Sequence, residues 1–143
     1  MNMHIEYATE QTLDPEEFRD LLVLSTLGER RPVDDAARIA DMVKHANLII
    51  TARLNGKLVG VSRSLTDFAF CTYLSDLAVA IEFQKMGIGK KLIWITKLAA
   101  PKALLILLSA PKAVDFYPRI GMKNHPHCYI LSDINELDID ISE

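Results

Sequence analysis

The sequence predicts an α+β domain in which helices flank a mixed β-sheet. Strand-length apolar runs and amphipathic stretches at helical spacing follow one another in the order β-α-α-β-β-β-α-β-α-β. One of the runs, residues 103–108, is apolar at every position, which is typical of a strand that pairs in parallel and is covered on both faces. The 143 residues suit a single domain, 1–143, whose residues 135–143 form an acidic tail with a tendency to fray.

In the first half of the chain, turn and cap residues set the element boundaries. Asp14-Pro15 opens a helix, since proline fits the first helical position. Asn55-Gly56 favours a type I′ hairpin turn. The expected elements are a strand at 4–8, a helix from 14 to about 28, a helix from 34 or 35 to 45, and strands at 48–54 and from 57 to 65 or beyond.

The second half is expected to alternate strands and helices. Pro101 ends the longest helix, and Trp94 within that nearly apolar helix is expected in the core. The expected elements are a strand at 70–80, a glycine turn, a helix at 88–100, a fully buried strand at 103–108, a helix from 109 to about 119, and a last strand at 127–131.

Composition excludes several functional classes. No apolar run approaches the ~20 residues that cross a bilayer, and the N-terminus lacks a secretory signal pattern, so we expect a cytoplasmic protein without membrane contact. Cys71 and Cys128 form no C-x-x-C pair, and His125-Pro-His127 beside Cys128 matches no metal-site spacing. We therefore expect neither a disulfide framework nor a metal site.

The net charge of −3 conceals a basic segment. Residues 85–123 hold eight lysines and arginines against one acid, Asp115, which suits a ligand that carries several phosphates. The alternative is a solvated helix surface, especially for Lys97 and Lys102. Nucleic acid is not an expected partner, because the basic residues are not interleaved with aromatic ones and the whole chain is acidic.

The chain is organised around a turn between a strand and a helix, Gln84-Lys-Met-Gly87-Ile-Gly89-Lys90. Glycines allow the backbone to pass close to a bulky ligand, and the first amides of a helix have no partners within it. Such a turn can hold an anion. A G-x-G tripeptide alone more often serves only the turn, so its meaning depends on the context.

Leu77-Ala-Val79 followed by Gln84-x-x-Gly87-x-Gly89 resembles the acyl-CoA signature of the GNAT N-acetyltransferase superfamily, R/Q-x-x-G-x-G/A. A second segment, Ala113-Val-Asp-Phe-Tyr117-Pro-Arg-Ile-Gly121-Met122, resembles the family's A-x-x-F-Y-x-x-x-G-F. The resemblance covers about residues 48–131. It implies that an acetyl group moves from acetyl-CoA to a primary amine by direct attack on the thioester. It also implies that the cofactor lies in a cleft between splayed central strands.

The resemblance implies a cofactor site made largely of main chain. Backbone amides of the turn would hold the pyrophosphate, and the strand before it would pair with pantetheine and polarise the thioester carbonyl through Leu77. Ala110 stands where many members carry an asparagine, so that contact is lost or supplied by Ser109. The implied cofactor-binding residues are Leu77, Ala78, Val79, Gln84, Lys85, Gly87, Ile88, Gly89, Lys90 and Ser109.

Two residues are candidates for catalysis. Tyr117 matches the tyrosine that in many members protonates the leaving thiolate; the alternative is a ring that only packs against the sheet. Asp76 could recognise or deprotonate the amine, or could be a hydrogen-bonded structural aspartate. Strand alternation places Asp76 on the face opposite Leu77 and Val79 unless a bulge intervenes.

The acceptor is expected to be an amine on a small molecule or a protein, and the family usually binds it near the segments equivalent to 29–35 and 68–73. A homodimer is expected only by analogy with the family. Because the sequence shows no obvious base, a non-catalytic acyl-CoA-binding regulatory module is an alternative. A pure interaction domain would require both motifs to be coincidences.

Overall fold

The computed structural model describes residues 3–139, which divide into two compact units, one ending at Ala110 and the other beginning at Pro111. The first unit contains a five-stranded sheet in the order β1-β2-β3-β4-β5, with β4 and β5 parallel and the other pairs antiparallel. The expected α+β class with a mixed sheet is confirmed. A single domain over 1–143 stays a prediction.

The elements of the first unit follow the expected order. They are β1 (Ile5–Thr9), α1 (Pro15–Leu24), the 3₁₀-helix η1 (Leu27–Arg30), α2 (Ala36–His45), β2 (Leu48–Leu54), β3 (Lys57–Thr66), β4 (Cys71–Val79), the 3₁₀-helix η2 (Ile81–Phe83), α3 (Ile88–Ala99) and β5 (Leu104–Ile106). The first helix ends at Leu24, earlier than the expected end near residue 28, and Gly28 lies in η1 instead.

Cap and turn residues act as the sequence predicts. Asp14 caps α1 by accepting a hydrogen bond from the Glu16 amide at 3.1 Å, and Asp35 caps α2. Asn55 and Gly56 have positive φ angles of 50° and 84°, as a type I′ turn requires, and pair Leu54 with Lys57.

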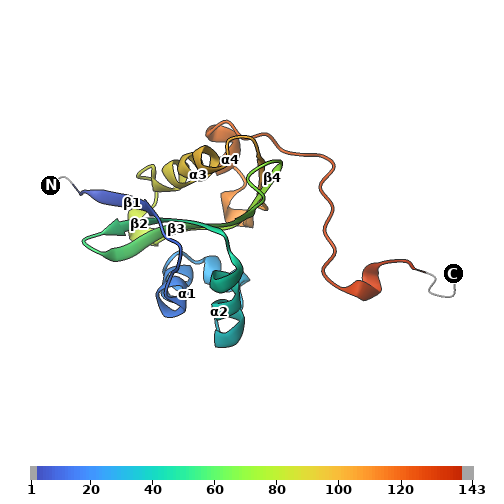
Figure 1. Cartoon of the computed structure of the whole chain (residues 1–143), viewed down its shortest axis with the longest axis horizontal. Helices are drawn as coiled ribbons and strands as arrows, with labels where there is room; N and C mark the ends of the chain where they lie inside the picture. Colours follow the sequence, from blue (N-terminus) through green and yellow to red (C-terminus); the bar gives the residue numbers. More distant parts are fainter. Residues whose placement is uncertain (1–2, 140–143) are drawn as a thin grey trace. The chain divides into compact units, whose positions relative to one another are not determined.

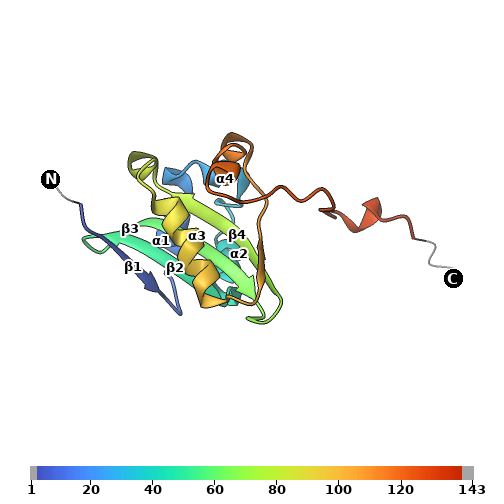
Figure 2. The same ribbon diagram turned by 90° about the horizontal axis from the view of Figure 1, so that it is seen from above.

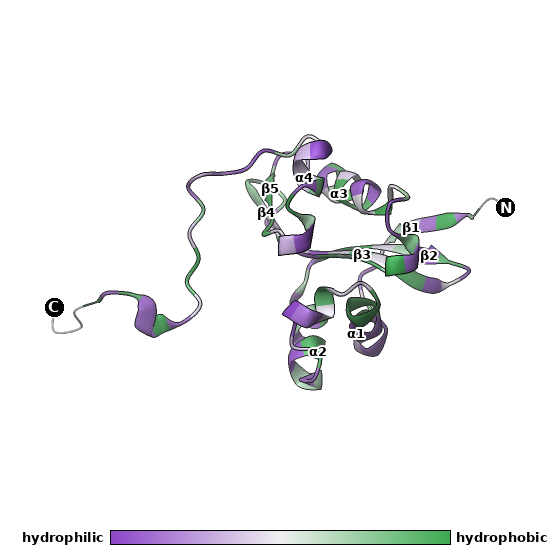
Figure 3. Cartoon of the chain, turned by 180° about the vertical axis from the view of Figure 1, so that it is seen from behind, coloured by the Kyte–Doolittle hydropathy of each residue, from purple (hydrophilic) through white to green (hydrophobic). Residues whose placement is uncertain are grey.

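Helices cover both faces of the sheet (Figure 1). On one face α1 and α2 bury Phe18, Leu22 and Ile39 against β3 and β4. On the other face α3 packs Ile88 and Leu92 onto β2 and β3 (Figures 2 and 3). A Cβ atom at Gly60 would lie 3.1 Å from Ile88 Cγ2, so the missing side chain lets the start of α3 approach β3 closely.

The parallel partners β4 and β5 stay together over only three residues. Cys71, Thr72 and Tyr73 pair with Leu104, Leu105 and Ile106. Beyond Tyr73, β4 pairs with β3 on one side, and on the other side no strand among the described residues pairs with Leu74–Val79. This open edge of β4 ends at Val79, five residues before Gln84, where the glycine turn begins.

Three expectations about strands and burial are wrong. Residues 103–108 do not form a fully buried strand: only Leu104–Ile106 is a strand, and Leu104 is 64% exposed because β5 is an edge strand. Residues 127–131 form no strand, and Tyr129 is 90% exposed. Trp94 is not in the core but 57% exposed.

The second unit contains the 3₁₀-helix η3 (Pro111–Ala113), α4 (Phe116–Arg119) and the 3₁₀-helix η4 (Ile134–Glu136), in place of one helix from 109 to 119. Gly121, with φ of 99°, ends α4, and the Met122 amide donates to the Tyr117 carbonyl at 3.0 Å. Of the expected acidic tail, residues 140–143 lie outside the described residues.

Candidate cofactor and acceptor site

The glycine turn (residues 84–89) leads into α3 with backbone amides that have no partner within the helix. Gly87 has φ of 84°, is exposed, and stands as the N-cap of α3 without a side-chain cap. The first hydrogen bond within α3 runs from the Lys91 amide to the Gly87 carbonyl at 3.1 Å. The amides of Ile88, Gly89 and Lys90 therefore have no backbone acceptor within the helix. The turn therefore has the partial positive charge that attracts an anion.

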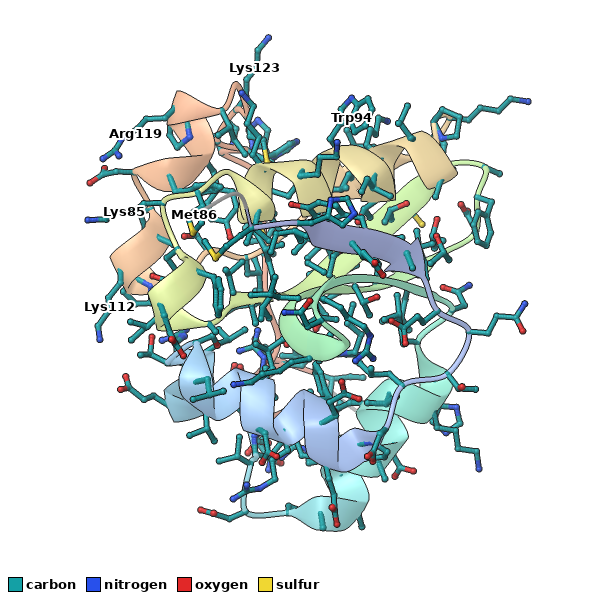
Figure 4. All side chains as sticks on the ribbon, turned by 90° about the vertical axis from the view of Figure 1, so that its left-hand side faces the viewer. Lys85, Met86, Trp94, Lys112, Arg119 and Lys123 are labelled. Atoms are coloured by element: carbon teal, nitrogen blue, oxygen red, sulfur yellow. The ribbon has the colours of Figure 1, made fainter. Side chains whose placement is uncertain are left out.

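Gln84 braces the turn against the end of β4. Its Nε2 donates to the Val79 carbonyl at 2.8 Å, so this side chain ties the two segments together. Lys85 follows with a positive φ of 64°, and Lys85 and Met86 lie on the turn that leads into α3 (Figure 4). The sequence alone gives no sign of this bracing contact.

A shallow surface depression of about 350 Å³ adjoins the turn and is lined by Gly87, Lys90, Lys91 and Trp94. The Lys91 ammonium lies 5.3 Å from the centroid of the Trp94 ring, and Trp94 stands on the side of α3 that faces away from the sheet (Figure 4). Farther along α3, Lys97 Nζ donates to the Pro101 and Ala103 carbonyls at 3.2 and 2.5 Å, so Lys97 fixes the chain after α3 and lies at the end of the helix away from the glycine turn.

The residues implied for pantetheine lie on the open edge of β4. Leu77 and Val79 pack on the α3 face of the sheet, whereas Ala78 and Asp76 lie on the α1–α2 face, as strand alternation predicts for this stretch of β4. The β3–β4 register shifts between Arg63 and Ser64, where Ser75 is the extra residue of β4. An extended ligand could add to this edge like a strand.

Asp76 is fully buried between two arginines. Its Oδ1 accepts from Arg31 Nε and its Oδ2 accepts from Arg63 Nε. Arg31 Nη2 also donates to the Ser75 carbonyl at 2.9 Å, and Arg63 Nη2 donates to the Ser75 hydroxyl at 3.0 Å. With both oxygens engaged, this geometry favours the structural alternative for Asp76 over an amine-binding or basic one.

Arg31 and Arg63 could not be predicted from the sequence as partners of Asp76. No spacing rule connects residue 31 with residue 76, and nothing in an alternating strand marks Arg63 as inward-facing. The one available signal is Asp76 itself, since a carboxylate on the buried face of a strand needs a cationic partner.

The segment expected on the acceptor side, residues 68–73, carries two exposed aromatic rings in the turn between β3 and β4. Phe68 and Phe70 are 48% and 78% exposed. Three backbone amides, those of Ala69, Phe70 and Cys71, donate to Asp67 Oδ1 at 2.8–3.0 Å. These bonds, led by that from Phe70, lower the pKa of Asp67 to about 2.

The lowered pKa of Asp67 should make the free energy of unfolding depend on pH between about 2 and 3.8. Its folded-state pKa lies below the ordinary value of 3.8, so its charge stabilises the fold above pH 3.8, and this contribution is lost as the pH falls towards about 2. Urea unfolding of the wild type and Asp67→Asn should show a stability difference that is constant from pH 5 to 7 and shrinks below about pH 4. A difference that grew on acidification would contradict this assignment.

Tyr117 and Ser109 complete the set of candidate residues. Tyr117 lies in α4 with its ring 5.1 Å from that of Phe116, and burial raises its pKa above 10.0. Ser109 lies in the first unit, and its hydroxyl donates to the Ala110 carbonyl at 2.8 Å. No group of three or more metal-ligating side chains occurs within residues 3–139.

Comparison with known proteins decides the family. The model of the acetyltransferase (GNAT) family matches residues 15–122, which is most of the chain. The chain belongs to the GNAT acetyltransferase family. Both resemblance motifs and the open edge of β4 lie within the matched range.

Individual relatives of this GNAT chain are distant. The uncharacterised N-acetyltransferase ycf52 of Pyropia yezoensis is 27% identical over 136 residues, which cover 82% of this chain and 78% of the relative. A GNAT acetyltransferase from Streptococcus pneumoniae is 19% identical with a TM-score of 0.73, covering 91% of this chain and all of that one. The aminoglycoside N-acetyltransferase AAC(6′)-Iy, solved in complex with CoA, is 13% identical with a TM-score of 0.70, covering 94% and 97%.

The family match identifies the chain as an N-acetyltransferase, and the solved neighbours confirm the expected GNAT fold. Family members use acetyl-CoA in general, and the residues present fit that group, because the glycine turn offers unpaired amides and the open edge of β4 offers unpaired strand positions. No helix among residues 3–139 is both long and apolar enough to span a bilayer.

Proposed function

We propose that the protein transfers the acetyl group of acetyl-CoA to a primary amine by direct attack on the thioester. The observation that carries this proposal is the continuity between the open edge of β4 and the glycine turn, which offers first strand positions and then helix amides. Pantetheine amides match the former, and a pyrophosphate matches the latter. In this proposal the cofactor-binding residues are Leu77, Ala78, Val79, Gln84, Lys85, Gly87, Ile88, Gly89, Lys90 and Ser109.

The chain's own groups would do four things in the reaction. The turn amides hold the diphosphate, and the β4 edge orients the thioester. The Leu77 amide donates to the carbonyl oxygen on which negative charge develops. Tyr117 gives its proton to the thiolate as the carbon–sulfur bond breaks. The amine attacks in its neutral form, and the proton it sheds leaves to solvent.

Tyr117→Phe tests the acid. We expect kcat to fall about 10²-fold while the Kd of acetyl-CoA changes less than about twofold, because only proton transfer is removed. Since burial raises the pKa of Tyr117 above its ordinary value, a loss of kcat through deprotonation of this acid should appear only at higher pH than for an exposed tyrosine. An unaltered kcat in the phenylalanine variant would remove Tyr117 from the mechanism, and Tyr129→Phe, a change at an exposed ring, is the matched control.

Thiol release in the presence of amines tests the function itself. The structural neighbours include aminoglycoside acetyltransferases, one of which was solved with sisomicin, so sisomicin belongs in the panel beside spermidine, L-lysine and a short peptide with a free N-terminus. Mass spectrometry with labelled acetyl-CoA then identifies the acetylated product. Cofactor binding by calorimetry without amine-dependent thiol release would instead support the acyl-CoA-binding regulatory module.

Assembly and location belong to the proposal as well. We propose a homodimer, supported by the exposed apolar side chains of Leu104, Ile106 and Leu108 on and beside the edge strand β5. Light scattering that found only monomers over a roughly 100-fold range of protein concentration would reject the dimer.

We also propose a cytoplasmic protein that acts on small-molecule or protein amines without nucleic-acid or membrane partners.

A further inference from the structure

We propose that Arg31 is a positioning residue that fastens the α1–α2 segment (residues 25–35) to β4 and so orders the amine side of the site. This inference rests on the proposed function for its kinetic consequence, but its structural part can be tested without turnover. Arg31 contacts β4 at Ser75 and Asp76, and it has no hydrogen bond with Leu77, Val79 or the glycine turn among those found in the described residues.

All three nitrogens of the Arg31 guanidinium are engaged. Nε donates to Asp76 Oδ1, Nη2 donates to the Ser75 carbonyl at 2.9 Å, and Nη1 donates to the Arg30 carbonyl at 2.9 Å. The first two bonds bridge 45 and 44 residues of sequence. A planar fork that binds a carboxylate and a carbonyl fixes direction as well as distance, which an ammonium does not.

The two arginines around Asp76 have different tasks. Arg63, whose side chain is 7% exposed, joins β3 to β4 and donates to the Met42 carbonyl of α2 at 3.0 Å, so it belongs to the interior framework. Arg31, whose side chain is 21% exposed, reaches in from the α1–α2 segment. Without Arg31, the buried carboxylate would still be compensated by Arg63, and the fold should persist.

The other contacts of the α1–α2 segment lie near its two ends. Thr26 adopts a positive φ of 72°, and Gly28 is buried so tightly that a Cβ atom would lie 3.1 Å from the Leu22 carbonyl oxygen. Leu27 and Val33 pack against the α1–α2 face of the core, and Arg19 Nε donates to the Val33 carbonyl at 2.8 Å. These contacts hold the two ends of the segment, while Arg31 fixes its middle.

The attachment point lies directly before the residues proposed to hold the acyl group. Ser75 is the bulged residue of β4, and Leu77, whose amide is proposed to polarise the thioester carbonyl, follows two residues later. A segment fastened at Ser75 and Asp76 is therefore held close to the position where an amine must approach that carbonyl. Loss of the fastening should affect the amine more than the cofactor.

The experiment compares Arg31→Met and Arg31→Lys with Arg30→Ala, which removes the neighbouring exposed cation. Hydrogen exchange of the amides of residues 26–34 should become at least about tenfold faster in Arg31→Met, and less so in Arg31→Lys, whereas Arg30→Ala should match the wild type. In assays with the amine of the panel that releases thiol fastest, the KM for amine should rise about tenfold in Arg31→Met. The Kd of acetyl-CoA from calorimetry should change less than about twofold.

Three results would reject the proposal that Arg31 positions the α1–α2 segment. Unchanged exchange at residues 26–34 would show that Arg31 does not hold the segment. Equal changes in the KM for amine and the Kd of acetyl-CoA would indicate a general structural role, as would an unfolded Arg31→Met protein, since Arg63 would then not suffice for Asp76. If the wild type releases no thiol, the proposed function fails, and the exchange experiment still decides whether the fastening exists.

Discussion

Replacing Gly87 with valine is expected to weaken acetyl-CoA binding at least about 100-fold, or nearly 3 kcal/mol. Gly87 has φ of 84°, where a β-branched residue is strained, and no protein atom lies within 4 Å of the position that its Cβ would take. The added side chain would thus occupy open space beside the turn amides, which the diphosphate needs. Isothermal calorimetry with acetyl-CoA measures the effect.

The chain offers a matched control for this substitution. Gly56 in the β2–β3 hairpin has the same φ of 84° and also has no protein atom within 4 Å of an added Cβ. Gly56→Val should therefore cost similar backbone strain, roughly 1–2 kcal/mol of unfolding free energy, without changing the Kd of acetyl-CoA. Equal cofactor affinities in the two variants would refute the turn as the phosphate site.

Asp76→Asn is expected to destabilise the protein by about 3–5 kcal/mol in urea unfolding. The change leaves the Arg63 guanidinium, with 7% of its side chain exposed, without its carboxylate and removes one anchor of Arg31. A buried charge without compensation is among the most costly single changes in a protein interior. The effect should be far larger than that of Arg31→Met, which leaves one cation facing one anion.

Asp20→Asn provides the comparison for this prediction. Asp20 makes an ion pair with Arg19 at 3.5 Å, but its side chain is 71% exposed. The same chemical substitution should cost less than about 1 kcal/mol there, because exposed ion pairs contribute little. If Asp76→Asn were equally mild and also abolished turnover, the carboxylate would have to be reassigned to the chemistry.

Much of the fold could be predicted because local signals agreed with the tertiary arrangement. Asp14, Asp35 and Asn55-Gly56 fix backbone groups through their own side chains or φ angles, so their effects are readable without knowledge of distant contacts. The glycine turn could be recognised for the same reason. Its proposed function depends on main-chain atoms beside two glycines, which have no side chains to cover them.

The errors arise where burial depends on partners far along the chain. Residues 103–108 have the composition of a doubly covered strand, yet β5 is an edge strand with Leu104 and Ile106 exposed. Trp94 follows the helical period but lies on the outer side of α3, next to Lys91. The contacts of Asp76 with Arg31 and Arg63 likewise required a structure, because no local pattern encodes which cation meets a buried carboxylate.

The short pairing between β4 and β5 also bears on how tightly the enzyme can discriminate among acyl chains. In the proposed function, strand positions would recognise peptide-like amides, which are the same in every acyl derivative of CoA, and the turn would recognise phosphates that all of them share. Neither feature measures the acyl chain itself. Any preference for acetyl over propionyl or longer groups would therefore come from side chains near the end of the pantetheine arm. Acyl selectivity could then change in evolution without any change in the turn that is proposed to bind the phosphates.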